Sequence, residues 1–378
     1  MRIAFISTKP ASLGSGTEVR NYYLLNGLRK IFTVDFYSPQ LIAKPNDLDR
    51  IYNLFTGKIP YIELVRSSLL DSKEIENIKK ADLIELQELE SFFAIEKYLP
   101  MFNKPVILDA HNIEYERFLS GTETEGFFIK WLGRILSRKI KKLEINAIEK
   151  INYILTCSDV DKQYFAKYFP EEKIIVIPNG VANQHSFHKD IVSKNNLLFM
   201  GLLSYGPNSD GIRFYLDEIH PLIKQIKKDI TVTIIGRNPP AWLLEKASLD
   251  SSIQVKGFVE DLDVELQKAH VCICPLRFGS GTRLKILEYM AAGKAVVSTS
   301  KGVEGLEVQD GKHLLKGDTP ELFAKNVVKL LEDSKLATNM GHSAEIFIKQ
   351  YYNWDAITTR LSHFYLDITN NNENTFNK

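Results

Sequence analysis

A chain of 378 residues is long enough for two domains of ordinary size, each with its own hydrophobic core. Hydrophobic residues make up 44% and charged residues 25%, as in globular proteins, and a net charge of +1 gives no general affinity for nucleic acid. No apolar run approaches the roughly 18 residues that cross a bilayer, and the chain opens on an apolar strand without a leader, so we expect a cytoplasmic protein.

Strands and helices alternate through the first half of the chain. Apolar runs predict strands at 3–7, 33–37, 83–86, 105–109, 153–157 and 174–177. A glycine-bearing loop at 14–18 leads into a predicted helix at about 18–30. This alternation favours an α/β domain with a parallel, doubly wound sheet over residues 1–180. The polar, turn-rich segment 181–194 is the predicted linker.

The second half repeats the pattern with shorter spacing. Apolar runs predict strands at 197–200, 231–235, 253–256, 271–274 and 295–298, and periodic segments predict helices at 211–227, 262–269, 282–291, 320–331, 343–350 and 354–366. We expect a second domain at 195–352, a C-terminal helix at 353–369 that can cross back to the first domain, and a disordered tail at 370–378. The predicted architecture is two Rossmann-like domains, each with a parallel, doubly wound sheet, facing a cleft.

The most informative stretch is 275–306, which reads PLRFGSGTRLKILEYMAAGKAVVSTSKGVEGL. A buried strand precedes its glycine loop, Thr282 is placed to cap the following helix, and Gly293 ends that helix. The free N–H groups and the dipole at such a helix start together form an anion site. The plainer interpretation is an ordinary strand–helix connection.

Charged residues near this helix start favour the anion site. Arg283 and Lys285 lie in the first predicted turn, where the helix dipole disfavours a cation unless an anion is bound. A diphosphate would supply that anion. Glu288 lies about one turn further on, where a carboxylate can accept from the paired hydroxyls of a ribose. The alternative is that the two basic side chains are simply solvated.

The segment GSGTRLKILEYMAAGKAVVSTSKGVEGL resembles the donor-binding segment of the retaining glycosyltransferases of family 4, which have the GT-B fold. The closest likeness is to the bacterial branch that builds surface polysaccharides and exopolysaccharides. The resemblance implies a UDP- or GDP-sugar donor on the C-terminal domain, a glycan or lipid-linked acceptor on the N-terminal domain, and no cofactor. It assigns Glu288 to the ribose. The residues that it places around the diphosphate are Gly279, Ser280, Gly281 and Thr282.

The resemblance also implies a pocket for the nucleotide base. It places this pocket at the loops after two strands, around Gly236, Arg237 and Val259. Backbone groups usually read the base there in the family. UDP and GDP donors both remain open.

The chain departs from the family at two positions. Many members carry an arginine and a lysine in the loop after the domain's first strand, but that loop reads MGLLSYGPNSDG here, with Leu202 at the arginine position. We expect Arg283 and Lys285 to substitute for this pair and to neutralise the leaving diphosphate. The family also carries a glutamate eight positions before the one that matches Glu288. Here that position is Ser280, which can bond a sugar hydroxyl more weakly than a carboxylate.

Three residues of the first half are candidates for substrate contact. Gly16 lets the backbone approach a phosphate or sugar closely, although the loop can also be a simple turn with Thr17 as a helix cap. His111 follows a predicted strand in the segment LDAHNIEYERF, and the resemblance gives it a role near the transferred sugar and the β-phosphate. A lone histidine can equally be structural. Glu114 is a candidate contact to the acceptor.

We expect no metal site. Asp-x-Asp pairs occur at 47/49, 159/161 and 261/263, but they fit turn and helix-cap positions better than metal ligands. Cys157, Cys272 and Cys274 each lie in an apolar run, where a thiol behaves as a small hydrophobe. The sequence therefore predicts metal-independent chemistry.

The segment 127–150 predicts a basic amphipathic helix with aromatic residues at its start. Such a helix is typical of a membrane surface contact, and anionic lipid would be its partner if the acceptor is lipid-linked. A core-packed helix with a solvated basic face is the alternative.

Other functions remain possible from the sequence. A GT-B-like sugar-nucleotide epimerase would turn over a UDP-sugar without an acceptor. A non-catalytic partner of an assembly complex would bind nucleotide without transfer or hydrolysis. A dinucleotide-dependent dehydrogenase is disfavoured because no G-x-G-x-x-G fingerprint follows the first strand.

Overall fold

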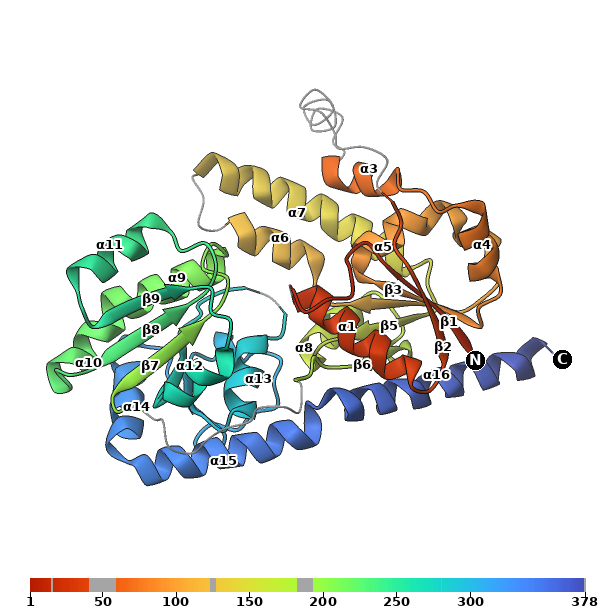
Figure 1. Cartoon of the computed structure of the whole chain (residues 1–378). Coiled ribbons are helices and arrows are strands. Elements are labelled where there is room, and N and C mark those ends of the chain that lie inside the picture. The colour runs from red at the N-terminus through yellow and green to blue at the C-terminus, as the bar shows by residue number, and fades with distance from the viewer. Residues whose placement is uncertain (15, 41–58, 123–126, 182–192, 280, 377–378) are drawn as a thin grey trace. The chain divides into compact units, whose positions relative to one another are not determined.

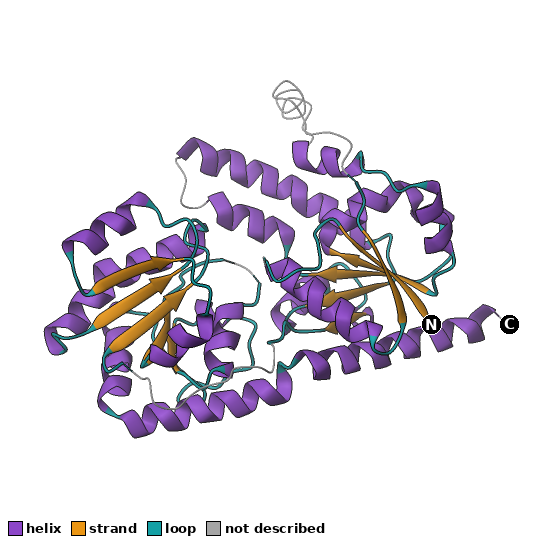
Figure 2. Ribbon diagram, in the orientation of Figure 1, coloured by secondary structure: helices purple, strands orange, loops and turns teal. Residues whose placement is uncertain are grey.

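The computed structural model describes residues 1–14, 16–40, 59–122, 127–181, 193–279 and 281–376 (Figure 1). The chain divides into an N-terminal unit, Met1–Glu116, Trp131–Asn179 and Trp354–Lys378, and a C-terminal unit, Arg117–Lys130 and Gly180–Asn353. Each unit is built around one parallel sheet with helices on both faces (Figure 2). The predicted α/β fold is confirmed. Positions 182–192 of the predicted linker lie outside the described residues.

The N-terminal sheet has six parallel strands in the order β2-β1-β3-β4-β5-β6. Their bounds are β1 Arg2–Ser7, β2 Thr33–Tyr37, β3 Leu83–Gln87, β4 Val106–Ala110, β5 Tyr153–Thr156 and β6 Ile174–Val176. The strand order reverses between β1 and β3. In open α/β sheets, ligands bind outside the carboxyl ends of the strands at such a switch point.

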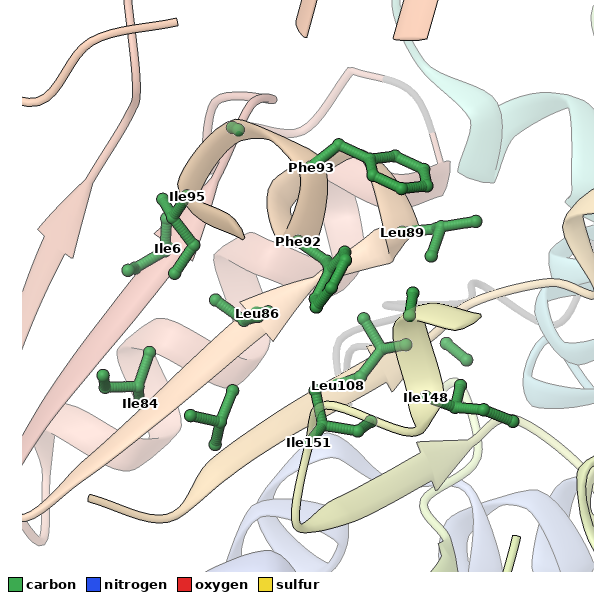
Figure 3. Close-up of a cluster of buried hydrophobic side chains, with 14 of the residues drawn as sticks. Ile6, Ile84, Leu86, Leu89, Phe92, Phe93, Ile95, Leu108, Ile148 and Ile151 are labelled. Atoms are coloured by element: carbon green, nitrogen blue, oxygen red, sulfur yellow. The ribbon is translucent and has the colours of Figure 1, made fainter. Parts of the chain in front are cut away.

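Helices cover both faces of this sheet. Their bounds are α1 Gly16–Arg29, α3 Pro60–Arg66, α4 Ser72–Lys79, α5 Glu88–Ile95, α7 Phe127–Ile148, α8 Asp159–Phe165 and α16 Trp354–Phe376. A further helix, α6 Glu114–Thr122, begins in this unit, and its residues from Arg117 on are assigned to the C-terminal unit. On one face, side chains of α5 and α7 pack on alternate residues of β1, β3 and β4 (Figure 3). On the other, Leu24 and Leu28 of α1 pack with Leu361 of α16 over the remaining strand residues. The C-terminal helix therefore belongs to the core of the N-terminal unit.

The C-terminal sheet has the order β12-β11-β10-β7-β8-β9, and its switch point lies between β7 and β10. The strand bounds are β7 Asn196–Met200, β8 Thr231–Ile235, β9 Ile253–Gly257, β10 Val271–Cys274, β11 Ala295–Ser298 and β12 Leu315–Lys316. The helix bounds are α9 Gly206–Phe214, α10 His220–Ile226, α11 Ala241–Leu249, α12 Leu262–Lys268, α13 Leu284–Ala291, α14 Pro320–Glu332 and α15 Ser334–Tyr351. The strands β7, β10 and β11 are buried along their whole length and β8 nearly so, as their continuous apolar runs predicted, whereas the edge strand β9 exposes Gln254 and Lys256.

Several helix bounds differ from the predicted ones. The predicted helix at 211–227 is two helices, α9 and α10, joined by a π turn at Tyr215–Ile219. The last turn of α9 and this π turn share one buried face, so the apolar pattern continues across the break. The helix α16 continues to Phe376, past the start of the predicted disordered tail.

Candidate active site

The loops after β7 and β10 flank the switch point of the C-terminal unit. The first begins at Gly201 and leads into α9, and the second runs from Pro275 to Arg283 and leads into α13. The first loop is the one in which Leu202 stands at the arginine position. The second loop is the glycine loop of the predicted anion site. Two neighbouring parallel strands therefore bring them to the same edge of the sheet.

The helix after the glycine loop starts later than predicted. Leu284 is its first residue and Arg283 its N-cap, with an extended backbone and no capping hydrogen bond from its side chain. Thr282 is therefore not the cap. Gly279 and Gly281 have φ angles of +115° and +75°, which side chains rarely adopt, so the loop turns away before the helix can begin. The predicted end is confirmed, since Gly293 has φ +63° two residues after Ala291.

The loop and the helix start offer polar groups to a ligand. The guanidinium of Arg283, a residue that is 8% exposed, donates to the carbonyl of Gly281. The Thr282 hydroxyl is buried and has no hydrogen-bond partner among the described residues. Ser280 lies outside the described residues. Glu288 is partly exposed on α13, one turn after the helix start.

Lys285 links the two loops. Its Nζ donates to Asn208 Oδ1 of α9 at 2.7 Å and lies 4.2 Å from the ring centre of Phe199 in β7. A Cβ atom on Gly201 would come within 2.8 Å of the same nitrogen. Part of the side chain reaches the surface, but the ammonium group is enclosed. This burial lowers the pKa of Lys285 to about 8, and the charge of Arg283 acts in the same direction.

Close glycine contacts shape the predicted base pocket. Gly236 N donates to Gly257 O at 2.7 Å, and a Cβ atom on Gly236 would lie 1.7 Å from Gly201 O. The next residues form a pair on the surface, with the guanidinium of Arg237 4.5 Å from the ring centre of Phe258. Val259 is partly buried against the α13 side of the core. The ends of β7, β8 and β9 thus approach one another closely through the backbone of Gly201, Gly236 and Gly257, beside the exposed ring of Phe258.

In the N-terminal unit, His111 lies among polar groups at the carboxyl ends of β3 and β4. Its Nε2 is 2.9 Å from Gln87 Oε1 and 3.5 Å from Asp109 Oδ2, and its Nδ1 is 3.6 Å from Glu88 Oε1. Glu88 has φ +62°, a strained conformation for a side-chain-bearing residue. Thr17 of α1 donates to Glu88 Oε1 at 2.8 Å, across the β1–β3 switch point. The placement of His111 after a strand is confirmed.

A buried ion pair supports this edge of the sheet. Arg20 of α1 donates to both oxygens of Asp109, at 2.8 and 2.9 Å, and both residues are almost fully buried. Burial opposes the ionisation of Asp109, but the charge and hydrogen bonds of Arg20, together with the contact to His111, outweigh it and lower the pKa of Asp109 to about 2. Arg20 also donates to the carbonyls of Ile177 and Pro178 after β6. One side chain therefore connects α1, β4 and the backbone that follows β6.

The other two candidates of the N-terminal unit lie at helix starts. Gly16 is exposed and is the first residue of α1, so Thr17 lies inside the helix and is not its cap. Glu114 is the first residue of α6, and its N–H donates to Glu144 Oε1 at 2.8 Å. The Glu114 side chain is partly exposed.

Among the described residues, no group of three or more His, Cys, Asp or Glu side chains could hold a metal ion. Asp261 caps α12, and Asp161 bonds to Ser158, which caps α8. Asp47 and Asp49 lie outside the described residues. All three cysteines are free and buried, as predicted. No helix in the described part of the chain combines the length and the apolar character needed to cross a membrane.

Four residues at these sites were not predicted. Glu85, Gln87, Arg20 and Asn208 are buried and hydrogen-bonded next to the candidates. The sequence did hold a signal for the first two, because Glu85 and Gln87 are polar residues at alternate positions of an otherwise apolar strand. Arg20 and Asn208 lie in helices and carry no comparable local signal.

Two family models match the chain in succession. The model described as Glycosyltransferase Family 4 matches residues 14–184, and the model described as Glycosyl transferases group 1 matches residues 194–333. The chain carries the two domains of a GT-B glycosyltransferase. The family resemblance read from the donor-binding segment is confirmed at this level. The glycosyltransferase's retaining mechanism, its pathway and the roles of individual site residues remain predictions.

Known proteins similar to this glycosyltransferase include two from bacteria. An uncharacterized 44.6 kDa protein in the cps region of Klebsiella pneumoniae is 29% identical over 318 residues, covering 81% of this chain and 79% of that protein. A Campylobacter jejuni α-1,4-N-acetyl-D-galactosaminyltransferase is 25% identical over 195 residues, covering 50% of this chain and 54% of that protein.

Solved structures share the fold of this glycosyltransferase. Anabaena HepE in complex with UDP and glucose gives a TM-score of 0.67 at 14% identity, covering 97% of this chain and 100% of that one. Sucrose-phosphate synthase from Thermosynechococcus elongatus gives a TM-score of 0.68 at 16% identity, covering 97% and 99%.

Proposed function

We propose that the protein transfers a sugar from a UDP- or GDP-sugar to a hydroxyl of a glycan or lipid-linked glycan, with retention of the anomeric configuration. The observation that carries this proposal is the placement of Lys285, whose enclosed ammonium group lies between the two loops at the switch point of the C-terminal unit. A cation in such a site, with a pKa of about 8, is poorly stabilised without an anion. A diphosphate is the anion that the family resemblance implies.

Departure of the diphosphate leaves negative charge that the protein must neutralise. In this proposal Lys285 and Arg283 face the phosphate oxygens, with the amides of Gly279 and Gly281 and the Thr282 hydroxyl as further donors. The unpartnered state of that hydroxyl supports its part. Ser280 is proposed to bond the donor sugar, which the family usually contacts through a glutamate.

The same arrangement supports the proposed substitution for the family's missing cations. Leu202 is 49% exposed and carries no charge, but Lys285 brings its ammonium group to Gly201 of that loop and to Asn208 in the first turn of α9. Lys285 of α13 can thus place its cation where family members usually have a cation from the loop after β7. Asn208 fixes the lysine head and, through Nδ2, also bonds Leu202 O at 2.9 Å.

The nucleoside part of the donor is proposed to lie against the neighbouring loops. Glu288 accepts from the ribose hydroxyls, and the base lies at Gly236, Arg237 and Val259. The exposed stacked pair of Arg237 and Phe258 supports this assignment, because a flat aromatic surface suits a base. In the N-terminal unit, His111 contacts the transferred sugar, while Gly16 and Glu114 are proposed for further sugar and acceptor contacts.

The test is donor turnover by the purified protein. With a matching α-linked UDP- or GDP-sugar, slow hydrolysis should release the α-anomer first, as followed by proton NMR before mutarotation. The Arg283→Ala/Lys285→Ala variant should lose most of this turnover. Release of the β-anomer would contradict retention, and normal turnover by the variant would refute the proposed diphosphate site.

We propose that transfer needs no metal cofactor, because the cations Arg283 and Lys285 carry the charge neutralisation. Turnover should then persist in excess EDTA. Loss of activity on chelation, with recovery on adding manganese, would contradict this part of the proposal.

We also propose that α7 contacts a membrane surface when the acceptor is lipid-linked. Arg134, Arg138 and Lys142 are exposed and four residues apart, so they share one face of the helix, and Trp131 is 53% exposed one turn earlier. The name of the Campylobacter relative gives an undecaprenol-linked acceptor for that protein, which supports a lipid-linked acceptor here.

Vesicle flotation tests this contact. The protein should float with vesicles containing anionic phosphatidylglycerol and not with neutral phosphatidylcholine vesicles. Substituting Glu for Arg134, Arg138 and Lys142 should abolish flotation, whereas the same change at Lys228, Lys312 and Lys335, three exposed lysines of the C-terminal unit, should not. Equal flotation with both vesicle types, or an equal effect of both triple variants, would exclude the proposed surface.

A further inference from the structure

Two polar residues lie inside a buried strand of the N-terminal unit. Glu85 and Gln87 lie on the same face of β3 as Leu83, the face that α1 and α16 cover. Neither side chain is exposed. Burying a carboxyl group and an amide is unfavourable unless hydrogen bonds compensate for the lost water. These residues therefore need a structural or functional reason.

The Gln87 amide connects Glu85 to His111. Its Nε2 donates to Glu85 Oε1 at 2.8 Å, which turns its Oε1 toward His111 Nε2 at 2.9 Å. A carbonyl oxygen can only accept, so this contact requires the proton of the imidazole to be on Nε2. The Asp109 carboxylate, 3.5 Å from the same nitrogen, is a second acceptor and favours the same tautomer.

The charges around the network keep its members in these states. Asp109 stays ionised because of Arg20, so it remains an acceptor for His111. Burial raises the pKa of Glu85 to about 8, and the charge of Asp109 acts in the same direction, whereas the Tyr365 hydroxyl, Gln87 and Arg20 oppose the shift. Glu85 is thus largely neutral at pH 7 and still offers its Oε1 to the Gln87 amide.

In the neutral Nε2–H tautomer, the other ring nitrogen of His111 carries a lone pair. Nδ1 is buried and makes no hydrogen bond with any described residue. The nearest carboxylate oxygen, Glu88 Oε1, is 3.6 Å from Nδ1, beyond hydrogen-bond distance, and it accepts from the Thr17 hydroxyl. A buried acceptor without a partner is unfavourable by about 1–3 kcal/mol, a loss that a ligand hydroxyl would remove.

We propose that Gln87, held by Glu85, is a positioning residue that keeps His111 in its Nε2–H tautomer, so that Nδ1 accepts a hydrogen bond from a hydroxyl of the bound sugar. The sugar rests on the proposed function, but the tautomer is a property of the protein alone. With the opposite tautomer, Nδ1 would be a donor, and Gln87 Oε1 would face an unprotonated nitrogen.

The tautomer can be measured directly by ¹⁵N NMR of the ring nitrogens in full-length protein labelled at histidine, without substrate. A His111→Gln variant identifies the His111 signals. We expect a protonated Nε2 and an unprotonated Nδ1 at pH 7. Gln87→Met leaves only the more distant Asp109 carboxylate at Nε2, so the Nε2–H tautomer should lose a measurable part of its population. A protonated Nδ1 in the wild type, whether in the Nδ1–H tautomer or in the imidazolium, or an unchanged pattern in Gln87→Met, would overturn the proposal.

Donor turnover gives the second readout. Gln87→Glu keeps an acceptor opposite His111 Nε2 and can accept the proton of neutral Glu85, so it should retain the tautomer and most of kcat. Gln87→Met should lower kcat by roughly tenfold or more with little change in KM. Equal kcat values for the two variants would also overturn the proposal. If the wild type turned over no nucleotide-sugar, the proposed function would fail, while the NMR result would still decide the role of Gln87.

Discussion

The low pKa of Lys285 gives diphosphate binding a pH dependence that can be measured. Burial beside Phe199 and Asn208 lowers this pKa to about 8 in the free protein, and Arg283 contributes to the shift. A bound diphosphate stabilises the charged form and raises the pKa, so binding above pH 8 must take up a proton. Affinity should therefore be constant below the free pKa and fall as the pH rises through it.

The size of the effect follows from the fraction of charged lysine. With a pKa of about 8, this fraction falls from about 0.9 at pH 7 to about 0.1 at pH 9. If the complex keeps Lys285 charged throughout, the dissociation constant for UDP or GDP should be roughly tenfold larger at pH 9 than at pH 7. One proton should be taken up per complex at the higher pH.

Isothermal titration calorimetry with UDP and GDP at pH 7, 8 and 9 measures this dependence. Lys285→Met should bind more weakly, and it should keep only the dependence that comes from titration of the nucleotide itself. Lys294→Met is a matched control: the pKa of Lys294 is also lowered by burial, but its Nζ bonds the carbonyls of Gln267 and Ala269 instead. It should keep the wild-type dependence. Equal wild-type affinity at pH 7 and pH 9, or an unchanged slope in Lys285→Met, would refute the reasoning.

Three further predictions concern stability and loop geometry. Because folding raises the pKa of Glu85 to about 8, wild-type unfolding free energy should fall by up to about 1.4 kcal/mol per pH unit from this group as the pH rises from about 5 to 8. Glu85→Gln should flatten that decline in urea denaturation, and an identical decline in both proteins would contradict it. Arg20→Met leaves Asp109 buried without its cation and should lower the unfolding free energy by about 3–5 kcal/mol in urea denaturation. A loss below about 1 kcal/mol would reject this prediction. Gly236→Ala places a Cβ atom 1.7 Å from Gly201 O and should lower both the melting temperature and the affinity for UDP or GDP. Gly257→Ala has open space around its Cβ atom and should lower both quantities less. Equal effects of the two variants would count against the importance of the contact between Gly236 and Gly201.

The fold could be predicted from the sequence because most strands are short, mainly apolar runs separated by turn formers or polar helices. The two-residue strand β12 was not predicted, because Leu315–Lys316 is too short to form such a run. The bounds were harder to predict. No feature of the local sequence distinguishes Thr282 from Arg283 as the N-cap of α13. The start of this helix depends on the backbone of the preceding loop, in which Gly281 has a positive φ angle. Similarly, the π turn at Tyr215–Ile219 keeps the same buried face as the helices on either side, so an apolar pattern cannot reveal it.

The site was predicted in part for a related reason. The glycine loop and Lys285 carry local signals, namely a strand, glycines and cations at a helix start. Asn208 lies 77 positions from Lys285, and Arg20 lies 89 positions from Asp109. Only the parallel sheet brings such residues together, and no spacing in the sequence encodes the contact. Gln87 matters through its hydrogen bonds on both sides, which also depend on the packed structure.

The central claim is that the cations beside the glycine loop of the C-terminal unit hold the diphosphate of a nucleotide-sugar. A crystal structure of the complex with UDP or GDP tests it most directly. We predict phosphate oxygens within hydrogen-bond distance of Lys285 Nζ and the Arg283 guanidinium. A well-ordered nucleotide whose phosphates contact neither side chain would contradict the account.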